Sequence, residues 1–236
     1  MKNLDFFEQF LEKSRSVVFF GGAGVSTESG IPDFRSEDGL YRQKFPFPPE
    51  YMLSHECFER HPEEFFQFYR EKMLAPDAKP NPAHRKLAEW EREGRLDAVV
   101  TQNIDGLHQA AGSRNVFDLH GSVHRNHCVR CGKGFPLSFV AGTEGVPRCP
   151  CGGIVKPDVV LYGESLPEDA WRGALRAVSR ADLLIVAGTS LAVYPASSLV
   201  ECCPGRLVVV NLSPTPADAR ADLVLRERVG ELFAAL

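Results

Sequence analysis

Short apolar runs recur along the chain, each followed directly by small or polar residues. The runs cover positions 16–20, 97–101, 183–187 and 207–210. Runs of this length and apolarity are typical of buried parallel strands. Helical spacing lies between them: helix formers with a polar face span 83–93 and 168–179, and leucines and phenylalanines repeat at helical spacing over 4–13. Strands that alternate with helices predict an α/β fold with a parallel sheet.

The residues that follow the predicted strands are the first candidates for a binding site. They are Gly-Gly-Ala-Gly at 21–24, Gln-Asn-Ile-Asp at 102–105, Gly-Thr-Ser at 188–190, and Asn211. Ligands of open α/β sheets bind outside the carboxyl ends of the strands. We therefore expect these clusters to lie around one ligand site.

Two segments interrupt the alternation and predict a second, smaller module. Residues 34–80 are rich in Phe, Pro and Arg, with a predicted helix at 62–73, and residues 128–153 are rich in cysteine and turn residues. We expect one folded unit in two parts, with the approximate bounds that follow. The large domain takes 1–35, 76–124 and 156–236, and the small module takes 36–75 as its helical part and 125–155 as its cysteine-rich part.

Composition narrows the function classes without naming one. The 236 residues are 44% hydrophobic and 25% charged, which is ordinary for a globular protein. A net charge of −4 gives no basic field, so nucleic acid is not an expected partner. The first residues lack a signal-peptide pattern, and no apolar stretch approaches the roughly 20 residues that span a bilayer. We expect a cytoplasmic protein with no membrane partner.

The glycine-rich segment after the first strand is typical of a dinucleotide site. Gly22, Ala23 and Gly24 allow a tight turn and a close approach to a pyrophosphate, with N–H groups of a following helix facing the anion. Alone, the segment fits a purely structural turn equally well, because the spacing is not G-x-G-x-x-G. A dehydrogenase is disfavoured, since Lys-Phe-Pro stands at 44–46 where an acidic residue is needed. Phe34 and Arg35, just past the turn, are expected to cover the reactive end of a bound nucleotide.

Two cysteine pairs predict a metal site. Cys128-x-x-Cys131 and Cys149-x-Cys151 have nearly the spacing of a closed four-cysteine zinc site, which is structural because it leaves no open position. Glycines at 132, 152 and 153 allow the sharp turns that direct amides at thiolates. Two alternatives stay open: unliganded thiols, and replacement of one cysteine by His124 or His127. With no secretory signal, a disulfide framework is not expected, and we interpret Cys57, Cys202 and Cys203 as ordinary buried thiols.

A histidine near the cysteine pairs is a candidate base. His120 lies in Leu-His-Gly-Ser at 119–122, and a pKa near neutrality suits a general base, although a lone histidine is more often structural. His108 is interpreted as a residue on a helix surface. Asp105 could be a helix cap only.

Taken together, these motifs resemble the sirtuin family of NAD-dependent protein deacylases. The resemblance runs through Gly-Ala-Gly-Val-Ser, Ser-Gly-Ile-Pro-Asp-Phe-Arg, Thr-Gln-Asn-Ile-Asp, Leu-His-Gly, the cysteine pairs, Pro-Asp-Val-Val-Leu-Tyr-Gly-Glu at 157–164, Gly-Thr-Ser, and Val-Asn-Leu-Ser at 210–213. It implies a Rossmann-like parallel-sheet domain with an inserted zinc-binding and helical module. It also implies NAD as a co-substrate, one structural Zn²⁺, acyl-lysine proteins or peptides as substrates, and we expect a monomer.

The resemblance also implies roles by position. His120 matches the general base, and Asn103 and Asp105 match residues that hold nicotinamide and the adjoining ribose. The implied cofactor contacts are Gly22, Ala23, Gly24, Thr27, Asp33, Phe34, Arg35, Gln102, Asn103, Ile104, Asp105, His120, Gly188, Thr189, Ser190, Asn211 and Val229. The implied peptide contacts, on a strand that pairs with an extended peptide, are Val159, Val160, Leu161, Tyr162 and Gly163. The implied zinc ligands are Cys128, Cys131, Cys149 and Cys151.

The implied reaction removes acetyl or another uncharged acyl group from lysine, giving nicotinamide, O-acyl-ADP-ribose and free lysine. Relatives that prefer succinyl or malonyl groups carry a Tyr-x-x-Arg pair, at whose places we align Phe66 and Tyr69, with Arg70 and Lys72 nearby. The hypothesis is therefore an apolar acyl pocket. Two alternatives stay open: a mono-ADP-ribosyltransferase, and a non-catalytic protein that senses NAD or uses the zinc module as a binding platform.

Overall fold

The computed structural model describes residues 2–34 and 47–236. The strands of the larger sheet are β1 (Val17–Gly21), β2 (Ala98–Thr101), β3 (Val116–Asp118), β7 (Leu183–Ala187), β8 (Arg206–Val210) and β9 (Leu223–Leu225). The α-helices around it are α1 (Lys2–Lys13), α5 (Pro82–Arg92), α6 (Leu107–Ala111), α8 (Glu168–Val178) and α9 (Val229–Ala234). Short 3₁₀ helices are η1 (Ala23–Val25), η2 (Thr27–Ser29), η4 (Ala196–Cys202) and η5 (Pro216–Ala219). The apolar runs and helical spacings read from the sequence are all confirmed as elements, with ends shifted by one or two residues.

All strands of the larger sheet are parallel, and their order determines where a crevice for a ligand forms. Its strand order is β3-β2-β1-β7-β8-β9. The chain leaves β1 toward β2 and β3 on one side, and returns to β7 on the other side of β1. The order therefore reverses between β1 and β7, and the loops after these two strands separate to leave a crevice.

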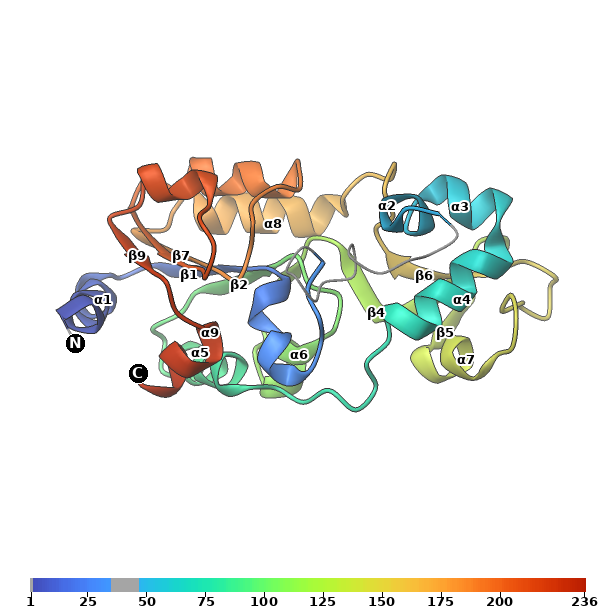
Figure 1. Cartoon of the computed structure of the whole chain (residues 1–236), viewed down its shortest axis with the longest axis horizontal. Helices are drawn as coiled ribbons and strands as arrows, with labels where there is room; N and C mark the ends of the chain where they lie inside the picture. Colours follow the sequence, from blue (N-terminus) through green and yellow to red (C-terminus); the bar gives the residue numbers. More distant parts are fainter. Residues whose placement is uncertain (1, 35–46) are drawn as a thin grey trace.

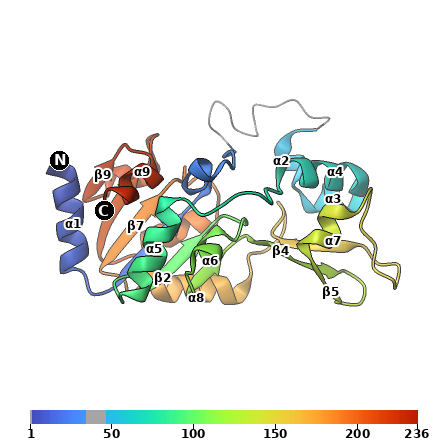
Figure 2. The same cartoon turned by 90° about the horizontal axis from the view of Figure 1, so that it is seen from below.

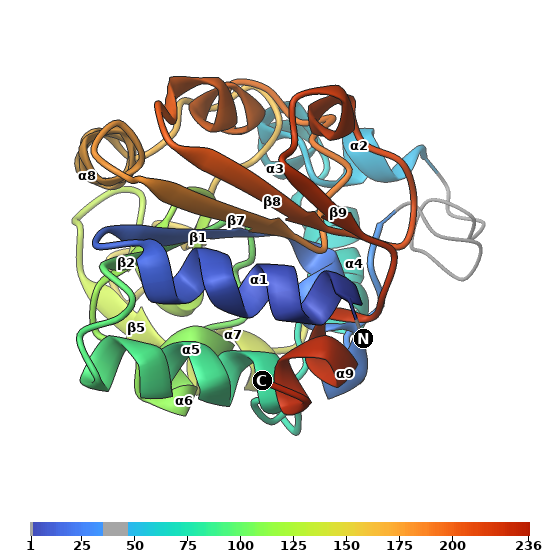
Figure 3. The same ribbon diagram turned by 90° about the vertical axis from the view of Figure 1, so that its left-hand side faces the viewer.

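Both faces of this sheet are covered by helices, which explains why its strands are apolar at every position. Val17 and Phe19 lie in a core cluster with α1, α5 and α9, whereas Val18 and Phe20 lie in a second cluster with α8 and η4. Figure 3 shows α8 above the sheet and α1, α5, α6 and α9 below it. Because every residue of β1 and β7 is buried, apolar and polar residues do not alternate along these strands.

A smaller unit lies at one end of the molecule, opposite α1 and α9 (Figure 1 and Figure 2). Its antiparallel sheet has the order β5-β4-β6, with β4 (Gly121–Cys128), β5 (Gly134–Pro136) and β6 (Val155–Val159). The helices α2 (Pro49–Met52), α3 (His55–Arg60), α4 (Pro62–Lys72) and α7 (Leu137–Gly142) pack with it around a core of their own. The strand β4 runs through the boundary expected at 124, and the division into two domains stays a prediction.

The start of α5 is tied to the glycine-rich turn. The side-chain oxygen of Asn81 accepts hydrogen bonds from the first amides of α5, and Pro82 follows at the first helical position. The Asn81 amide donates to the carbonyl of Val25 over 2.7 Å. One helix cap therefore also holds the turn that follows β1.

Across residues 2–34 and 47–236, no helix combines the length and the apolar character needed to cross a membrane.

Candidate active site and cysteine cluster

A cavity of about 1060 Å³ lies at the carboxyl ends of β1, β2 and β7 and extends to the small unit. Most of the predicted cofactor and catalytic residues line it together: Ala23, Gly24, Thr27, Asp33, Phe34, Gln102, Asn103, Ile104, Asp105, His120, Gly188, Thr189, Ser190, Asn211 and Val229. All five predicted peptide residues, 159–163, line it too. Gly22 is not among the lining residues, and Arg35 lies outside the described residues. The cavity is large enough for a dinucleotide and part of a second substrate.

The glycine-rich turn differs from the predicted turn and helix. Two short 3₁₀ helices, η1 and η2, follow β1 in place of an α-helix. The amides of Gly22 and Gly24 do not face a ligand, because they donate to the carbonyls of Ala187 and Gly188 over 3.1 and 2.8 Å. A Cβ on Gly24 would lie 2.8 Å from the Cα of Gly188. These glycines are needed for the close contact between the β1 and β7 loops.

A polar cluster of one buried and two half-buried residues lies on one side of the cavity, and it contains a residue that the sequence interpretation did not single out. The hydroxyl of Ser26, which is 1% exposed, donates to Asp105 over 2.7 Å and accepts from the amide of Asn103 over 3.0 Å. Asp105 also accepts the amide of Leu107 over 2.9 Å, but the residue at the N-cap of α6 is Gly106, so the interpretation of Asp105 as a helix cap is wrong. Burial raises the pKa of Asp105, against these hydrogen bonds that lower it. Ser26 lies two positions after Gly24 in Gly-Ala-Gly-Val-Ser, and that motif was the available signal.

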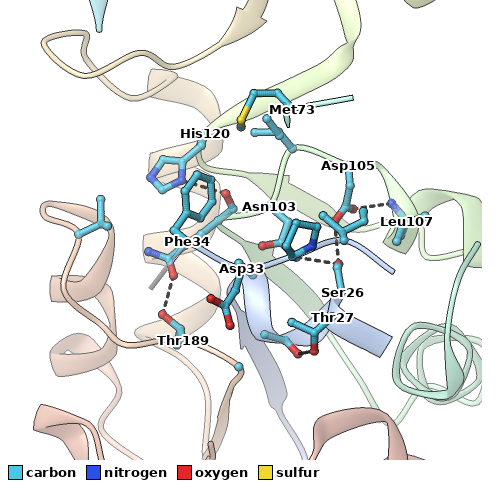
Figure 4. Close-up of a pocket in the computed structure, with 18 of the residues that line it drawn as sticks. Ser26, Thr27, Asp33, Phe34, Met73, Asn103, Asp105, Leu107, His120 and Thr189 are labelled. Atoms are coloured by element: carbon cyan, nitrogen blue, oxygen red, sulfur yellow. Dashed lines mark hydrogen bonds between the residues drawn. The ribbon is translucent and has the colours of Figure 1, made fainter. Parts of the chain in front are cut away.

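His120 lies on the opposite side of the cavity from Ser26 and Asp105 (Figure 4). Its Nδ1 is 2.9 Å from the carbonyl oxygen of Gln102, and a carbonyl only accepts, so Nδ1 carries the proton. In the neutral ring, Nε2 is then free of a proton. Burial lowers the pKa of His120, which favours this neutral form. The ring is prepared to accept a proton at Nε2.

The side chain of Gln102 connects two of the loops. Its Oε1 accepts the hydroxyl of Thr189 over 2.8 Å, which joins the ends of β2 and β7. The backbone carbonyl of the same residue holds His120. The orientation of the candidate base therefore depends on the same residue that fixes the cofactor loops.

The interpretation of His108 as a surface residue is wrong. His108 is 1% exposed and packs against His84 and Phe19, with ring centroids 4.7 and 5.9 Å away. Its helix α6 lies against α5, so the side chain of His108 points into the core between these helices and the larger sheet. Burial lowers the pKa of His108 and keeps it neutral. In a helix of five residues, spacing alone does not identify the inward face.

The predicted peptide strand is only partly a strand. Val159 ends β6, and the next residues leave the sheet. The amide of Val160 donates to the carbonyl of His120 over 3.0 Å, and the amide of Tyr162 donates to Leu53 over 2.9 Å. The segment 159–163 is therefore a strand end followed by a tight turn, with Tyr162 40% exposed.

The two positions aligned with the Tyr-x-x-Arg pair do not line the cavity. Phe66 and Tyr69 are fully buried in the core of the small unit. Lys72 and Met73, at the end of the same helix, line the cavity instead. Phe34, Ile104 and Val123 line it as well.

The four cysteines form one cluster in the small unit. Their Sγ atoms lie within 4.8 Å of one another, with Cys128 and Cys151 3.4 Å apart and Cys131 and Cys149 3.6 Å apart. With Zn–S bonds of about 2.3 Å, tetrahedral thiolates are separated by roughly 3.8 Å. All four thiols are free of disulfides. The cluster fits a single zinc ion with four sulfur ligands.

The surrounding backbone supports the same assignment. The amide of Arg130 points at the sulfur of Cys128 over 3.4 Å. A Cβ on Gly153 would lie 2.6 Å from that sulfur, and Gly132 and Gly152 have φ of +72° and +85°, as sharp turns require. The histidine alternatives are wrong: His124 contacts the carbonyl of Asp105, and His127 contacts Asp158.

The three remaining cysteines are not all alike. Cys57 and Cys203 are buried, as expected. Cys202 is exposed, so its interpretation as a buried thiol is wrong. It lies at the end of η4, where only one of two neighbouring side chains can face the core.

Fold and site together define an α/β protein with a nucleotide-sized cavity at the point where the strand order reverses. The family model described as the Sir2 family matches residues 22–195, and the chain belongs to this family. The chain is 56% identical over 231 residues to an NAD-dependent protein deacetylase of Clostridium acetobutylicum, covering 96% of this chain and 94% of that protein. It is also 56% identical over 230 residues to an NAD-dependent protein deacetylase of Cutibacterium acnes, with the same coverage of both chains.

Solved structures agree with these relatives. The structure described as Sir2, p53 peptide and NAD⁺ superposes with a TM-score of 0.87 at 43% identity, covering 98% of this chain and 96% of that one. A Sir2 variant with deacetylated p53 peptide and 3′-O-acetyl ADP-ribose superposes with a TM-score of 0.92 at 42% identity and the same coverage. The likeness therefore extends over both units of the molecule.

Proposed function

We propose that this protein is an NAD-dependent protein-lysine deacetylase, which releases nicotinamide, O-acyl-ADP-ribose and free lysine. The observation that carries the proposal is one cavity with a neutral, half-buried His120 on one side and the Ser26–Asn103–Asp105 cluster on the other. Relatives 56% identical over nearly the whole chain are named NAD-dependent protein deacetylases. NAD is a co-substrate of the reaction.

The cofactor residues divide into two groups along the cavity. We assign Ala23, Gly24, Thr27, Asp33, Phe34 and the loop 102–105 to the phosphates, the nicotinamide and its ribose. We assign Gly188, Thr189, Ser190, Asn211 and Val229 to the adenosine half. Bound NAD supplies an electrophilic ribose carbon with nicotinamide as its leaving group.

Asn103 and Asp105 have the role of holding that end of the cofactor. The hydroxyl of Ser26 orients both side chains at once, since it donates to the carboxylate and accepts from the amide. A preoriented cluster is worth more in a buried site than in water, because it needs no reorganisation during the reaction. Ser26 thus acts through Asn103 and Asp105 as a positioning residue.

His120 is assigned as the general base. With Nδ1 held by the carbonyl of Gln102, the ring accepts a proton at Nε2 without changing its tautomer. Its lowered pKa keeps it unprotonated at neutral pH. A positioned base of this kind contributes about 10²–10⁴-fold to a reaction rate.

The segment 159–163 is assigned to the substrate peptide, and the residues near Met73 and Val123 to the acyl group. The apolar lining there supports acetyl or another uncharged acyl chain. Lys72 is the residue that tests this preference, because it is a cation on the same lining. The four cysteines are assigned to one structural zinc, since four protein ligands leave no position for a reactive water.

The experiment is a panel of acyl-lysine peptides incubated with NAD, followed by mass spectrometry of all products. We expect nicotinamide release to depend on the peptide and to be faster with acetyl-lysine than with succinyl-lysine. Faster turnover of the succinyl peptide contradicts the apolar acyl pocket. A peptide that gains ADP-ribose and keeps its acyl group identifies the alternative, a mono-ADP-ribosyltransferase. The expected monomeric state, cytoplasmic location and lack of nucleic-acid binding stay predictions.

A further inference from the structure

The peptide segment 159–163 is anchored to the small unit by the residues that begin α3. The amide of Tyr162 donates to the carbonyl of Leu53, and the amide of His55 donates to the carbonyl of Tyr162, each over 2.9 Å. Ser54 and Tyr162 form an isolated parallel bridge. The first residues of α3 therefore fix where the exposed turn of the segment lies.

A single carboxylate joins this anchor to the segment. Glu164 accepts the amide of Leu161 over 2.9 Å, and its own amide donates to the carbonyl of Leu161 over 2.9 Å. The same carboxylate contacts Nζ of Lys156 at 3.1 Å and Nδ1 of His55 at 2.8 Å. Burial opposes its charge, but the Leu161 amide, His55 and Lys156 together hold the pKa of Glu164 below its ordinary value. Glu164 thus closes the turn and ties it to both β6 and α3.

His55 is the titratable member of this junction. Its Nδ1 faces Glu164 at 2.8 Å, and its Nε2 faces Glu59 of the same helix at 3.2 Å. Carboxylates accept hydrogen bonds, so only the doubly protonated ring donates to both. The hydrogen bond to Glu164 raises the pKa of His55, against a smaller effect of burial and with further help from Glu59. The charged groups around the ring are Glu59 on α3, Glu164 after β6, and Lys156 on β6 behind Glu164.

We propose that the junction of His55, Glu164 and Lys156 positions the peptide segment, and that the affinity for the substrate peptide therefore falls as the pH rises. This inference rests on the proposed function, because it takes 159–163 as the site of the peptide. The three residues are positioning residues, which act on the peptide through the backbone of Leu161 and Tyr162.

The direction in which peptide affinity changes with pH follows from the direction of the pKa shift of His55. Because the pKa of His55 is raised above the ordinary histidine value of about 6.5, its charge-assisted bond to Glu164 is fully present below that pH. The charged bond is lost as the pH rises through the raised pKa, and the neutral ring keeps one donor. A charged hydrogen bond is roughly twice as strong as a neutral one. Since the ring is 46% exposed, we expect a change of only about two- to fivefold in peptide affinity.

The test measures the KM for an acetyl-lysine peptide from about pH 6 to pH 8.5 at saturating NAD. The peptide has blocked ends and no titratable side chain, so that its own charge stays constant. For the wild type we expect the peptide KM to rise about two- to fivefold, with the KM for NAD unaffected. His55→Gln, which keeps a donor but does not titrate, gives a flat profile. Glu164→Gln raises the peptide KM at every pH and removes the slope.

The matched control is Glu56→Gln, which breaks an ion pair with Arg60 on the outer part of the same helix. It is expected to keep the wild-type slope. Amide hydrogen exchange of residues 160–164 supplies a readout without substrate: at low pH these amides exchange faster in His55→Gln than in the wild type, and the difference shrinks as the pH rises.

Two results would show that His55 does not position the segment. Equal slopes of the peptide KM in the wild type and in His55→Gln overturn the proposal, and so does equal exchange of residues 160–164 at low pH. A wild-type protein that deacylates no peptide contradicts the proposed function instead, and the exchange comparison still decides whether His55 holds the segment.

Discussion

Gly24→Ala tests whether close contact between the β1 and β7 loops builds the cofactor site. The added Cβ would lie 2.8 Å from the Cα of Gly188 and 2.9 Å from its carbonyl oxygen, so the loops must separate by several tenths of an ångström or more. Overpacking of this kind costs about 1–3 kcal/mol. The bond from the Gly24 amide to the Gly188 carbonyl, 2.8 Å long, also weakens, at about 1 kcal/mol.

The total of about 2–4 kcal/mol lowers Tm by roughly 5–15 °C in a protein of this length. Because separated loops also displace the residues assigned to NAD, we expect the KM for NAD to rise about tenfold, while the KM for peptide changes little. The assays are thermal unfolding monitored by circular dichroism and steady-state kinetics with each substrate varied in turn.

Gly30→Ala is the control, since Gly30 has φ of +83° and nothing within 4 Å of an added Cβ. It is expected to cost about 1–2 kcal/mol through backbone strain alone, with an unchanged KM for NAD. If Gly24→Ala keeps the wild-type Tm and KM for NAD, the loop contact does not shape the site and this reasoning fails.

Two further predictions concern the base and the zinc. His120→Ala is expected to lower kcat by about 10²–10⁴-fold with NAD binding retained. In the wild type, the base must be unprotonated, and burial lowers the pKa of His120. We therefore expect wild-type kcat to fall with decreasing pH only below about 6.5. If His120→Ala keeps the wild-type pH profile of kcat, a residue other than His120 is the base. Cys149→Ser is expected to lose the zinc, about one ion per chain, and to lower Tm, whereas Cys202→Ser, at an exposed cysteine outside the cluster, retains both. Metal analysis measures the zinc content, and thermal unfolding measures Tm. Folded, active wild-type protein without zinc contradicts the structural role.

The elements predicted from the sequence are those whose signal is local. The strand at 183–187 is apolar at every position because both faces of the sheet are covered, and that pattern is visible without the fold. The cysteine pairs are equally visible, since two short spacings suffice to predict a four-thiolate cluster. Residues after the strand ends meet in one cavity because parallel strands end at the same edge.

What the sequence did not reveal depends on contacts between distant segments. The hydrogen bonds of the Gly22 and Gly24 amides are made to a loop more than 160 positions away, so a local motif gave no reason to expect them. The burial of His108 depends on where α5 packs. Ser26 looked like one small residue in a turn, and its role becomes visible only where Asn103 and Asp105 approach it.

The conformation of the segment assigned to the acyl-lysine peptide was predicted only in part. Residues 159–163 were expected to form a strand, but the chain turns after Val159 because Glu164 and the start of α3 take up its backbone groups. Side-chain contacts such as that between His55 and Glu164 join segments about a hundred residues apart. No spacing within either segment predicts them.

The central claim is that NAD is consumed as the acceptor of the acyl group. The measurement that tests it most directly is the mass of the ADP-ribose product formed from an acetyl-lysine peptide carrying an isotope label in its acetyl group. The proposed function predicts that the label leaves the lysine and appears on ADP-ribose, in equal amounts with nicotinamide and free lysine. Label that stays on the peptide while nicotinamide is released, or label that is released as free acetate from the first turnover, would contradict it.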